Sequence, residues 1–270
     1  MADREELKEV LKKLHQAMPE DLGRVKKEAE KYFKETDPKE LALAEQELIQ
    51  EGTQRSEMKR LCDVHLEVMK GRLGIAAKKL KLPASHPISI LKDEHKVIKR
   101  NLKKLTKTLK KLKAAGSFEK AKKQIDTIKE LSHFFLETDK HHKREEDAIF
   151  PRLEAHGIVE PPAIFKEDHV EFMAKKRQLN ELAKDAEKKG FKEFIGVVGP
   201  VIEFLAKNLD EHIYKEDNIL YPIAYETLEK SEWKDVRRKF DAIGYCCFAP
   251  ADLGGKHGKV SKHAHKGSHK

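Results

Sequence analysis

Residues 141–151 read HHKREEDAIFP, and residues 212–222 read HIYKEDNILYP. Both stretches begin with histidine, carry acidic residues at their fifth and sixth positions, and end in an aromatic residue followed by proline. The spacing His-x-x-x-Glu places the two side chains on one face of a helix, one turn apart. The repetition therefore predicts two copies of one helical unit, each presenting a histidine and a glutamate in the same direction.

The repetition continues upstream of each stretch. ILKDEHKVI ends an acidic pair at His95, and IFKEDHVEF ends another at His169. Start and stop signals such as Gly116, Gly157 and Gly190 divide this region into four long helical segments. We expect them at residues 87–114, 117–155, 162–189 and 191–228. Short connections favour antiparallel neighbours, so the sequence predicts an all-α protein built on an antiparallel four-helix bundle.

Composition agrees with this fold class and suggests the domain organisation. Of the 270 residues, 38% are charged and 39% are hydrophobic, as is typical of amphipathic helices. Loss of periodicity around Pro83 and Pro87 indicates a domain boundary. We expect four parts: a small helical domain at 1–72, a linker at 73–86, the bundle with a short C-terminal helix at 87–243, and a cysteine pair followed by a basic, histidine-rich disordered tail at 244–270.

Several classes of protein are disfavoured. No run of about 18 apolar residues and no apolar signal core is present, so we predict a cytoplasmic protein that does not contact a membrane. Cys62, Cys246 and Cys247 are too few and unevenly placed for a disulfide framework. The formal charge of +9 is concentrated in residues 96–113 and 256–270 without interleaved aromatic residues, which makes nucleic acid an unlikely partner.

Helical periodicity places polar residues on the stripes that face the core. His95 heads a stripe of Ile and Leu residues, and His141 with Glu145 shares its register with His212 and Glu216. Buried carboxylates are costly unless their charge is compensated. A network of His-to-Glu hydrogen bonds would explain one such group. Six of them in a two-fold pattern predict instead a pair of divalent metal ions, with these ligands: His95, His141, Glu145, His169, His212 and Glu216.

His142 and Glu146 form a second pair with the same spacing. Alignment of the two stretches places His142 opposite Ile213 and Glu146 opposite Asp217, so it favours the pair of His141 and Glu145 as ligands. Other residues are candidates for additional ligands or for groups that support the ligands. These are His86, His133, His142, Glu146 and Asp217.

The repeated motifs and the single inward histidine before each of them resemble the hemerythrin-like, His-His-Glu cation-binding family over residues 86–228. The resemblance implies two non-haem iron ions with a bridging oxo or hydroxo group, held by the six ligands above, with Glu145 and Glu216 as bridges. Zinc or manganese are the alternative metals. Oxygen-carrying members have a further histidine where this chain has Met173, which implies more open metal positions here.

The N-terminal part, through DPKELALAEQELIQEG and RLCDVH, resembles a helical domain of unknown function found before hemerythrin-like domains. We therefore expect a protein that binds or senses dioxygen or nitric oxide and signals to a protein partner through this domain. One alternative is an enzyme that reduces nitric oxide or peroxide, or that donates iron for iron-sulfur cluster repair. The repair role is weakened because the N-terminal unit has only Cys62. A bundle that holds zinc, or no catalytic metal, would not respond to oxygen.

Overall fold

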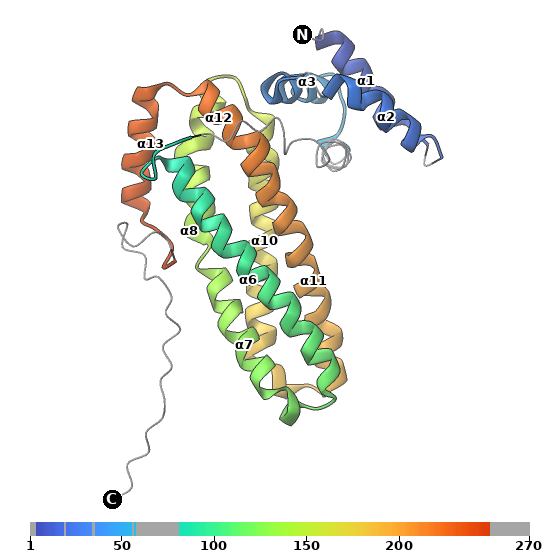
Figure 1. The fold of residues 1–270 in the computed structure, drawn as a ribbon, viewed down its shortest axis with the longest axis vertical. Helices are drawn as coiled ribbons and strands as arrows, with labels where there is room; N and C mark the ends of the chain where they lie inside the picture. The colour runs from blue at the N-terminus through green and yellow to red at the C-terminus, as the bar shows by residue number, and fades with distance from the viewer. Residues whose placement is uncertain (1–3, 19, 34–35, 56, 58–80, 249–270) are drawn as a thin grey trace, which may run out of the picture.

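The computed structural model describes residues 4–18, 20–33, 36–55, 57 and 81–248, and every regular element in these ranges is helical (Figure 1). Residues 73–80 of the expected linker, Cys62 and the tail from residue 249 lie outside the described residues. The N-terminal unit contains α1 (Arg4–Gln16), α2 (Leu22–Phe33) and α3 (Pro38–Gln50). Its helices bury a separate apolar cluster that includes Leu11 and Leu48.

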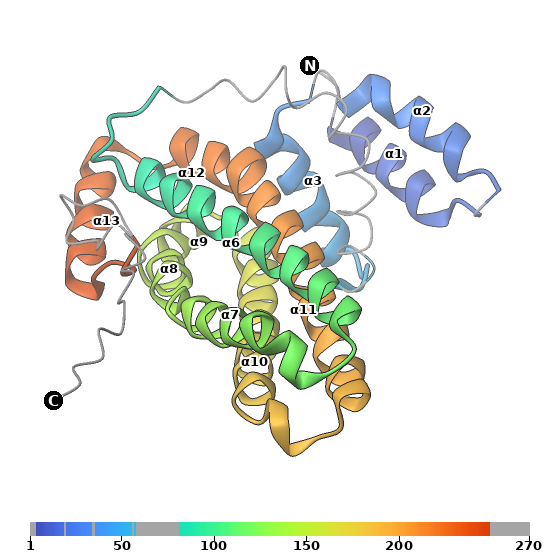
Figure 2. The same ribbon diagram turned by 60° about the horizontal axis from the view of Figure 1, so that its bottom comes forward.

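Four long helices form the predicted bundle. They are α6 (Pro87–Ala115), α7 (Phe118–Leu136), α10 (Glu160–Lys184) and α11 (Phe191–Lys215). Viewed toward one end, they surround a common centre in the order α6, α7, α10, α11 (Figure 2). A single 3-10 turn, η2 (Ala186–Lys188), lies between α10 and α11. The all-α class and the four-helix bundle are confirmed.

Helix ends follow local capping chemistry. Asp37 caps α3, because its Oδ1 accepts a hydrogen bond of 2.7 Å from the backbone N of Lys39. Gly116 ends α6 in the left-handed conformation, with φ of 79°, which glycine adopts without strain. Ser231 lies inside the first turn of the last helix, α13 (Lys230–Ile243), and does not cap it. Glu229 is the cap and forms a reciprocal capping box with Glu232.

The second and fourth long helices, expected as the segments 117–155 and 191–228, are each divided into shorter helical elements. After α7 the chain forms α8 (Asp139–Arg144), a π-helical turn η1 (Glu145–Ile149) and α9 (Phe150–Ala155). In the same way α11 continues into a π-helical turn η3 (Glu216–Leu220) and α12 (Tyr221–Thr227). Pro151 and Pro222 have no amide hydrogen, so the helical hydrogen-bond ladder cannot continue regularly through them. Each π-helical turn begins at one of the predicted bridging glutamates.

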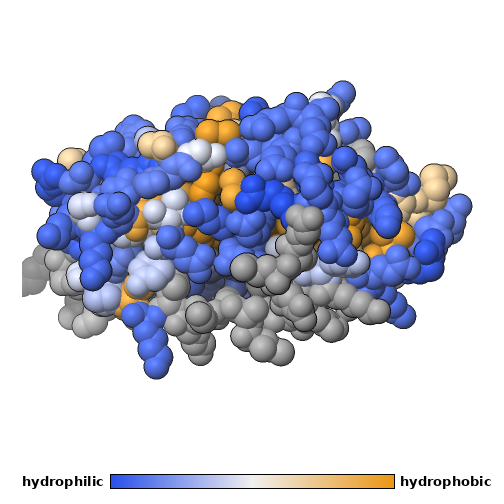
Figure 3. Space-filling view, turned by 90° about the horizontal axis from the view of Figure 1, so that it is seen from above, coloured by the Kyte–Doolittle hydropathy of each residue, from blue (hydrophilic) through white to orange (hydrophobic). Residues whose placement is uncertain are grey.

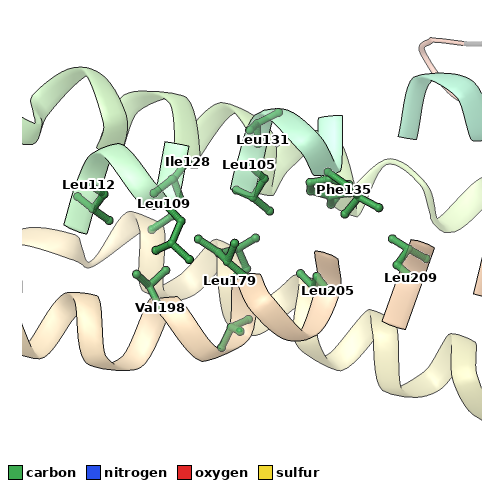
Figure 4. Close-up of a cluster of buried hydrophobic side chains, with 14 of the residues drawn as sticks. Leu105, Leu109, Leu112, Ile128, Leu131, Phe135, Leu179, Val198, Leu205 and Leu209 are labelled. Carbon is green, nitrogen blue, oxygen red and sulfur yellow. The ribbon is translucent and has the colours of Figure 1, made fainter. Parts of the chain in front are cut away.

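The end of the bundle at the bottom of Figure 1 is an apolar core. Leu105, Phe135, Leu179 and Leu205 come from the four different helices and point into it (Figure 4). Complete burial of each such side chain contributes roughly 1.5–3 kcal/mol. Because this half is filled by hydrophobic side chains, it rigidly sets the spacing of the helices at the other end, where the polar residues lie.

Two further elements cover that polar end. Helix α13 packs against α8 and η1 and buries Trp233 and Phe240 in a second apolar cluster. Helix α3 of the N-terminal unit contacts α10 and α12 (Figure 1). The outer surface at this end is mostly hydrophilic, with scattered apolar residues (Figure 3). Among the described helices, none has a stretch long and apolar enough to cross a membrane.

Candidate metal centre

Four histidines form two pairs inside the polar end of the bundle. His95 on α6 and His141 on α8 point their Nε2 atoms toward one another at 3.0 Å. His169 on α10 and His212 on α11 do the same at 3.1 Å. All four side chains are at most 3% exposed. Each helical hairpin therefore supplies one pair of inward-facing imidazole nitrogens.

Two glutamates lie between the pairs. Glu216 Oε2 is 3.0 Å from His95 Nε2, and its Oε1 is 2.8 Å from His212 Nε2. Glu145 Oε2 is 3.7 Å from His141 Nε2 and 3.6 Å from His169 Nε2. Each carboxylate therefore contacts both histidine pairs, and Glu216 Oε1 also lies 3.7 Å from His169 Nε2. Their places at the start of η1 and η3 follow from the π-helical turns that the prolines terminate.

Every one of the four histidines also contacts a carboxylate through its outer nitrogen, Nδ1. The partners are Asp217 Oδ1 for His95 at 3.0 Å, Glu94 Oε2 for His141 at 2.7 Å, Glu146 Oε1 for His169 at 2.7 Å, and Asp168 Oδ2 for His212 at 3.1 Å. A carboxylate at Nδ1 holds a hydrogen there and fixes the ring orientation, so Nε2 faces the centre and offers its lone pair when the imidazole is neutral. This is the arrangement that orients metal-binding histidines.

Glu94 and Asp168 were not among the residues predicted for the site. The signal was present in the sequence, since each directly precedes an inward histidine within a repeated acidic pair. Glu94 is also bonded to Arg144, whose fully buried guanidinium lies over the rings of Phe240 and Tyr245 at 5.3 and 5.0 Å. Burial opposes ionisation of Glu94, but His141 and Arg144 outweigh it and lower its pKa to about 2.

The metal-free centre holds protons. Burial and the neighbouring Glu216 raise the pKa of Glu145 well above its usual range. Burial also opposes ionisation of Glu216, but His212, His169 and His95 outweigh it and hold the pKa of Glu216 well below its usual range. Burial disfavours protonation of His95, yet Asp217 and Glu216 raise its pKa to about 10. A bound cation would displace these protons, so metal affinity must fall at low pH.

The donor set fits a pair of cations. Oε2 of Glu145 and both carboxylate oxygens of Glu216 are buried and accept no hydrogen bond of good geometry. Among the described residues, two groups of donor atoms each lie within 4.8 Å of one another. One group is His95, His141 and Glu216, and the other is His169, His212 and Glu216. Imidazole and carboxylate donors suit iron, zinc and manganese.

Comparison with protein families agrees with this geometry. Residues 86–224 match the family described as the hemerythrin HHE cation binding domain, which is just over half of the chain. The chain belongs to the hemerythrin HHE cation-binding family. Residues 7–74 match a second family, DUF438, whose function is unknown. The comparison with curated proteins found no match.

The other candidate residues have different places in this hemerythrin-like bundle. Glu146 and Asp217 hold imidazoles from outside, as described above. His142 is buried, and its ring stacks on that of His169 with 4.0 Å between centroids and 5° between planes. His142, like Glu145, belongs to neither of the two groups of convergent donors found among the described residues. Burial, followed by the charge of Lys176, holds the pKa of His142 well below its usual range, so we expect a neutral packing partner for His169.

His86 and His133 lie outside the centre. Nδ1 of His86 accepts a hydrogen bond of 3.2 Å from the backbone N of Ile88, so this histidine caps α6. Its ring packs against Trp233 with 4.7 Å between centroids. His133 is exposed on α7. Neither belongs to a group of convergent donors in the described part of the chain.

A surface pocket of about 450 Å³ reaches one side of the centre. The residues that line it include Asp139, His142, Glu146, His169 and Met173. Met173 occupies the position at which, by the resemblance described above, oxygen-carrying members of the family have a further histidine. Because the pocket contacts His169 and no residue of the pair formed by His95 and His141, it approaches the centre asymmetrically.

Proposed function

We propose that this protein is a non-haem di-iron protein that binds or senses dioxygen or nitric oxide. The proposed ligands are His95, His141, Glu145, His169, His212 and Glu216. The observation that carries the proposal is the position of Glu216, whose two oxygens face different histidine pairs at 3.0 and 2.8 Å. When bound, a pair of ferrous ions supplies electrons to dioxygen or an open position for nitric oxide.

Protein groups around the centre support a small ligand. The six proposed ligands are at most 3% exposed, so bulk solvent and large substrates do not reach them. The surface pocket lined by His169 and Met173 lies beside one edge of the centre, where a small molecule can approach it. The four outer carboxylates hold the imidazoles in place, so ligand binding requires little rearrangement of the side chains. A diatomic molecule suits a centre whose ligands are this deeply buried.

The proposal includes a signalling role for the N-terminal unit. Gln46 on α3 donates from Nε2 to the carbonyl oxygen of Gly157 at 2.9 Å, and its Oε1 accepts from the backbone N of Val159 at 2.9 Å. Arg55 pairs with Glu160 at the start of α10. These contacts join the unit to the turn before the helix that carries His169, so a change at the centre has a short route to a protein partner bound there.

Reduction of nitric oxide or peroxide is the alternative function, and iron donation for iron-sulfur cluster repair is a further version of it. The described cysteines do not strengthen the repair role. Cys246 is buried beside Arg144, and burial and the nearby Glu94 raise the pKa of its thiol, so it is not a reactive thiolate. Irreversible chemistry at the centre would favour the reductase.

The test is to load the metal-free protein with ferrous iron without oxygen and to count iron per chain. Optical spectra are recorded before oxygen, after oxygen and after purging. We expect two irons per chain and a visible band that appears with oxygen and disappears on purging. Lasting oxidation would move the assignment to the redox enzyme, and a protein that takes up no iron would refute the di-iron proposal.

Matched variants test the bridging residues. Glu145→Ala and Glu216→Ala should both reduce the iron count below two, because each removes a carboxylate that contacts both histidine pairs. Glu171→Gln, at an exposed position on α10, is the control and should keep the full count. An unchanged count in both alanine variants would contradict the assignment of these residues as bridges.

A further inference from the structure

The two halves of the centre differ in the aromatic residue that follows each π-helical turn. Phe150 and Tyr221 are equivalent residues, since each directly follows a π-helical turn and precedes a proline. Phe150 stacks on His169 with 6.0 Å between ring centroids and 20° between planes. Tyr221 stacks on His95 with 5.6 Å and 10°. The rings correspond, so the hydroxyl group of Tyr221 beside His95 has no counterpart beside His169.

That hydroxyl group points into the centre. It donates a hydrogen bond of 2.6 Å to Glu145 Oε1, and it lies 3.4 Å from His95 Nε2. Tyr221 is completely buried. A packing role alone would be served by phenylalanine, as it is at Phe150 in the other half. The placement of the oxygen among the donor atoms therefore needs a separate explanation.

The distances are those of atoms that share one ion. Neighbouring donors on an octahedral ion with bonds of about 2.1 Å lie about 3 Å apart. In this half, His95 Nε2 is 3.0 Å from His141 Nε2 and 3.0 Å from Glu216 Oε2. The hydroxyl oxygen of Tyr221 is slightly farther from the same nitrogen, at 3.4 Å, and lies 2.6 Å from Glu145 Oε1. It therefore lies where a further oxygen ligand would be.

We propose that Tyr221 is a ligand of the metal ion held by His95 and His141, and that the two metal positions are therefore unequal. The inference rests on the metal centre of the proposed function. On binding, the phenol proton leaves to solvent and the phenolate oxygen takes a coordination position. The ion at His169 and His212 has no phenolate and lies beside the pocket, so an external small ligand binds at that position.

Resonance Raman spectroscopy of the ferric protein tests the inference, because a phenolate bound to ferric iron gives a visible charge-transfer band and enhances tyrosine ring vibrations. Wild type should show these vibrations, and Tyr221→Phe should lose them while it keeps its iron. Tyr225→Phe is the matched control, since Tyr225 is 40% exposed one turn later on α12. Phenolate vibrations that persist in Tyr221→Phe, or that are missing from iron-loaded wild type, would overturn the inference.

The iron count separates this inference from the proposed function. One iron per chain with Tyr221-dependent vibrations would support Tyr221 as a ligand and refute the dinuclear centre. Two irons per chain without phenolate vibrations would support the dinuclear centre and refute Tyr221 as a ligand. As a further check, adding Phe150→Tyr to the Tyr221→Phe variant should restore a phenolate signal from the half that contains His169. No restored signal would contradict the equivalence of Phe150 and Tyr221 on which the argument depends.

Discussion

Replacing Lys176 with methionine should stabilise the metal-free protein at neutral pH. Lys176 lies on α10, two turns beyond His169, and its side chain is completely buried. Its Nζ donates one hydrogen bond of 2.7 Å, to Thr138 Oγ1. Burial lowers the pKa of Lys176 from 10.5 to about 8, even though Asp139 and other negative groups oppose that shift. Burial of the protonated Lys176 therefore lowers the free energy of unfolding.

The cost follows from the difference between the two pKa values. A lowering from 10.5 to about 8 corresponds to a penalty of about 3 kcal/mol on the folded state when Lys176 is protonated in both states. Below pH 8 the penalty is complete. Between pH 8 and 10.5 the unfolded chain binds the proton more strongly than the folded one, so raising the pH stabilises the wild type. By pH 10 less than about 1 kcal/mol should remain.

Urea unfolding of the metal-free proteins, followed by circular dichroism at pH 7 and pH 10, measures this difference. Lys176→Met should increase the free energy of unfolding by about 2–3 kcal/mol at pH 7, and the increase should largely disappear at pH 10. Lys103→Met, at an exposed position on α6, is the control and should change little at either pH. A destabilised Lys176→Met, or a stabilisation that does not depend on pH, would refute the reasoning.

Two other predictions concern contacts around the centre. Glu146→Gln and Asp217→Asn should each weaken metal binding by about 10–100-fold in a chelator competition, because each removes a carboxylate from the Nδ1 of a histidine. Glu171→Gln should have no effect, and equal affinities in all three variants would exclude the orienting role. Gln46→Ala should lower the free energy of unfolding by about 1–3 kcal/mol. It should also speed amide hydrogen exchange at Val159, because the N–H of that residue loses its hydrogen-bond acceptor. Unchanged exchange at that amide would show that the contact does not hold the N-terminal unit.

Much of the fold could be predicted from the spacing of apolar residues. The stripe from Ile98 to Leu112 is buried as expected, because a helix repeats every 3.6 residues whatever it packs against. The interruptions in the second and fourth helices were harder to predict from the sequence. A proline predicts a disturbance in a helix, but whether the chain bends, stops or widens into a π-helical turn depends on which neighbouring groups take the freed hydrogen bonds. Lys239 on α13, for example, donates to the carbonyl oxygen of Asp147 at 2.9 Å.

The sequence by itself determined that His95, His169 and the two His-x-x-x-Glu motifs face inward, because they lie on apolar helix faces. It could not pair them across helices. Two contacts depend on how far the helices are rotated and how closely they approach. Glu94 supports His141 rather than its neighbour His95, and Tyr221 from the second helical hairpin bonds Glu145 of the first. Those quantities are set by the packing of the apolar core. Spacing along one helix therefore determined which of these residues face inward, and only the tertiary structure determined which residues they contact.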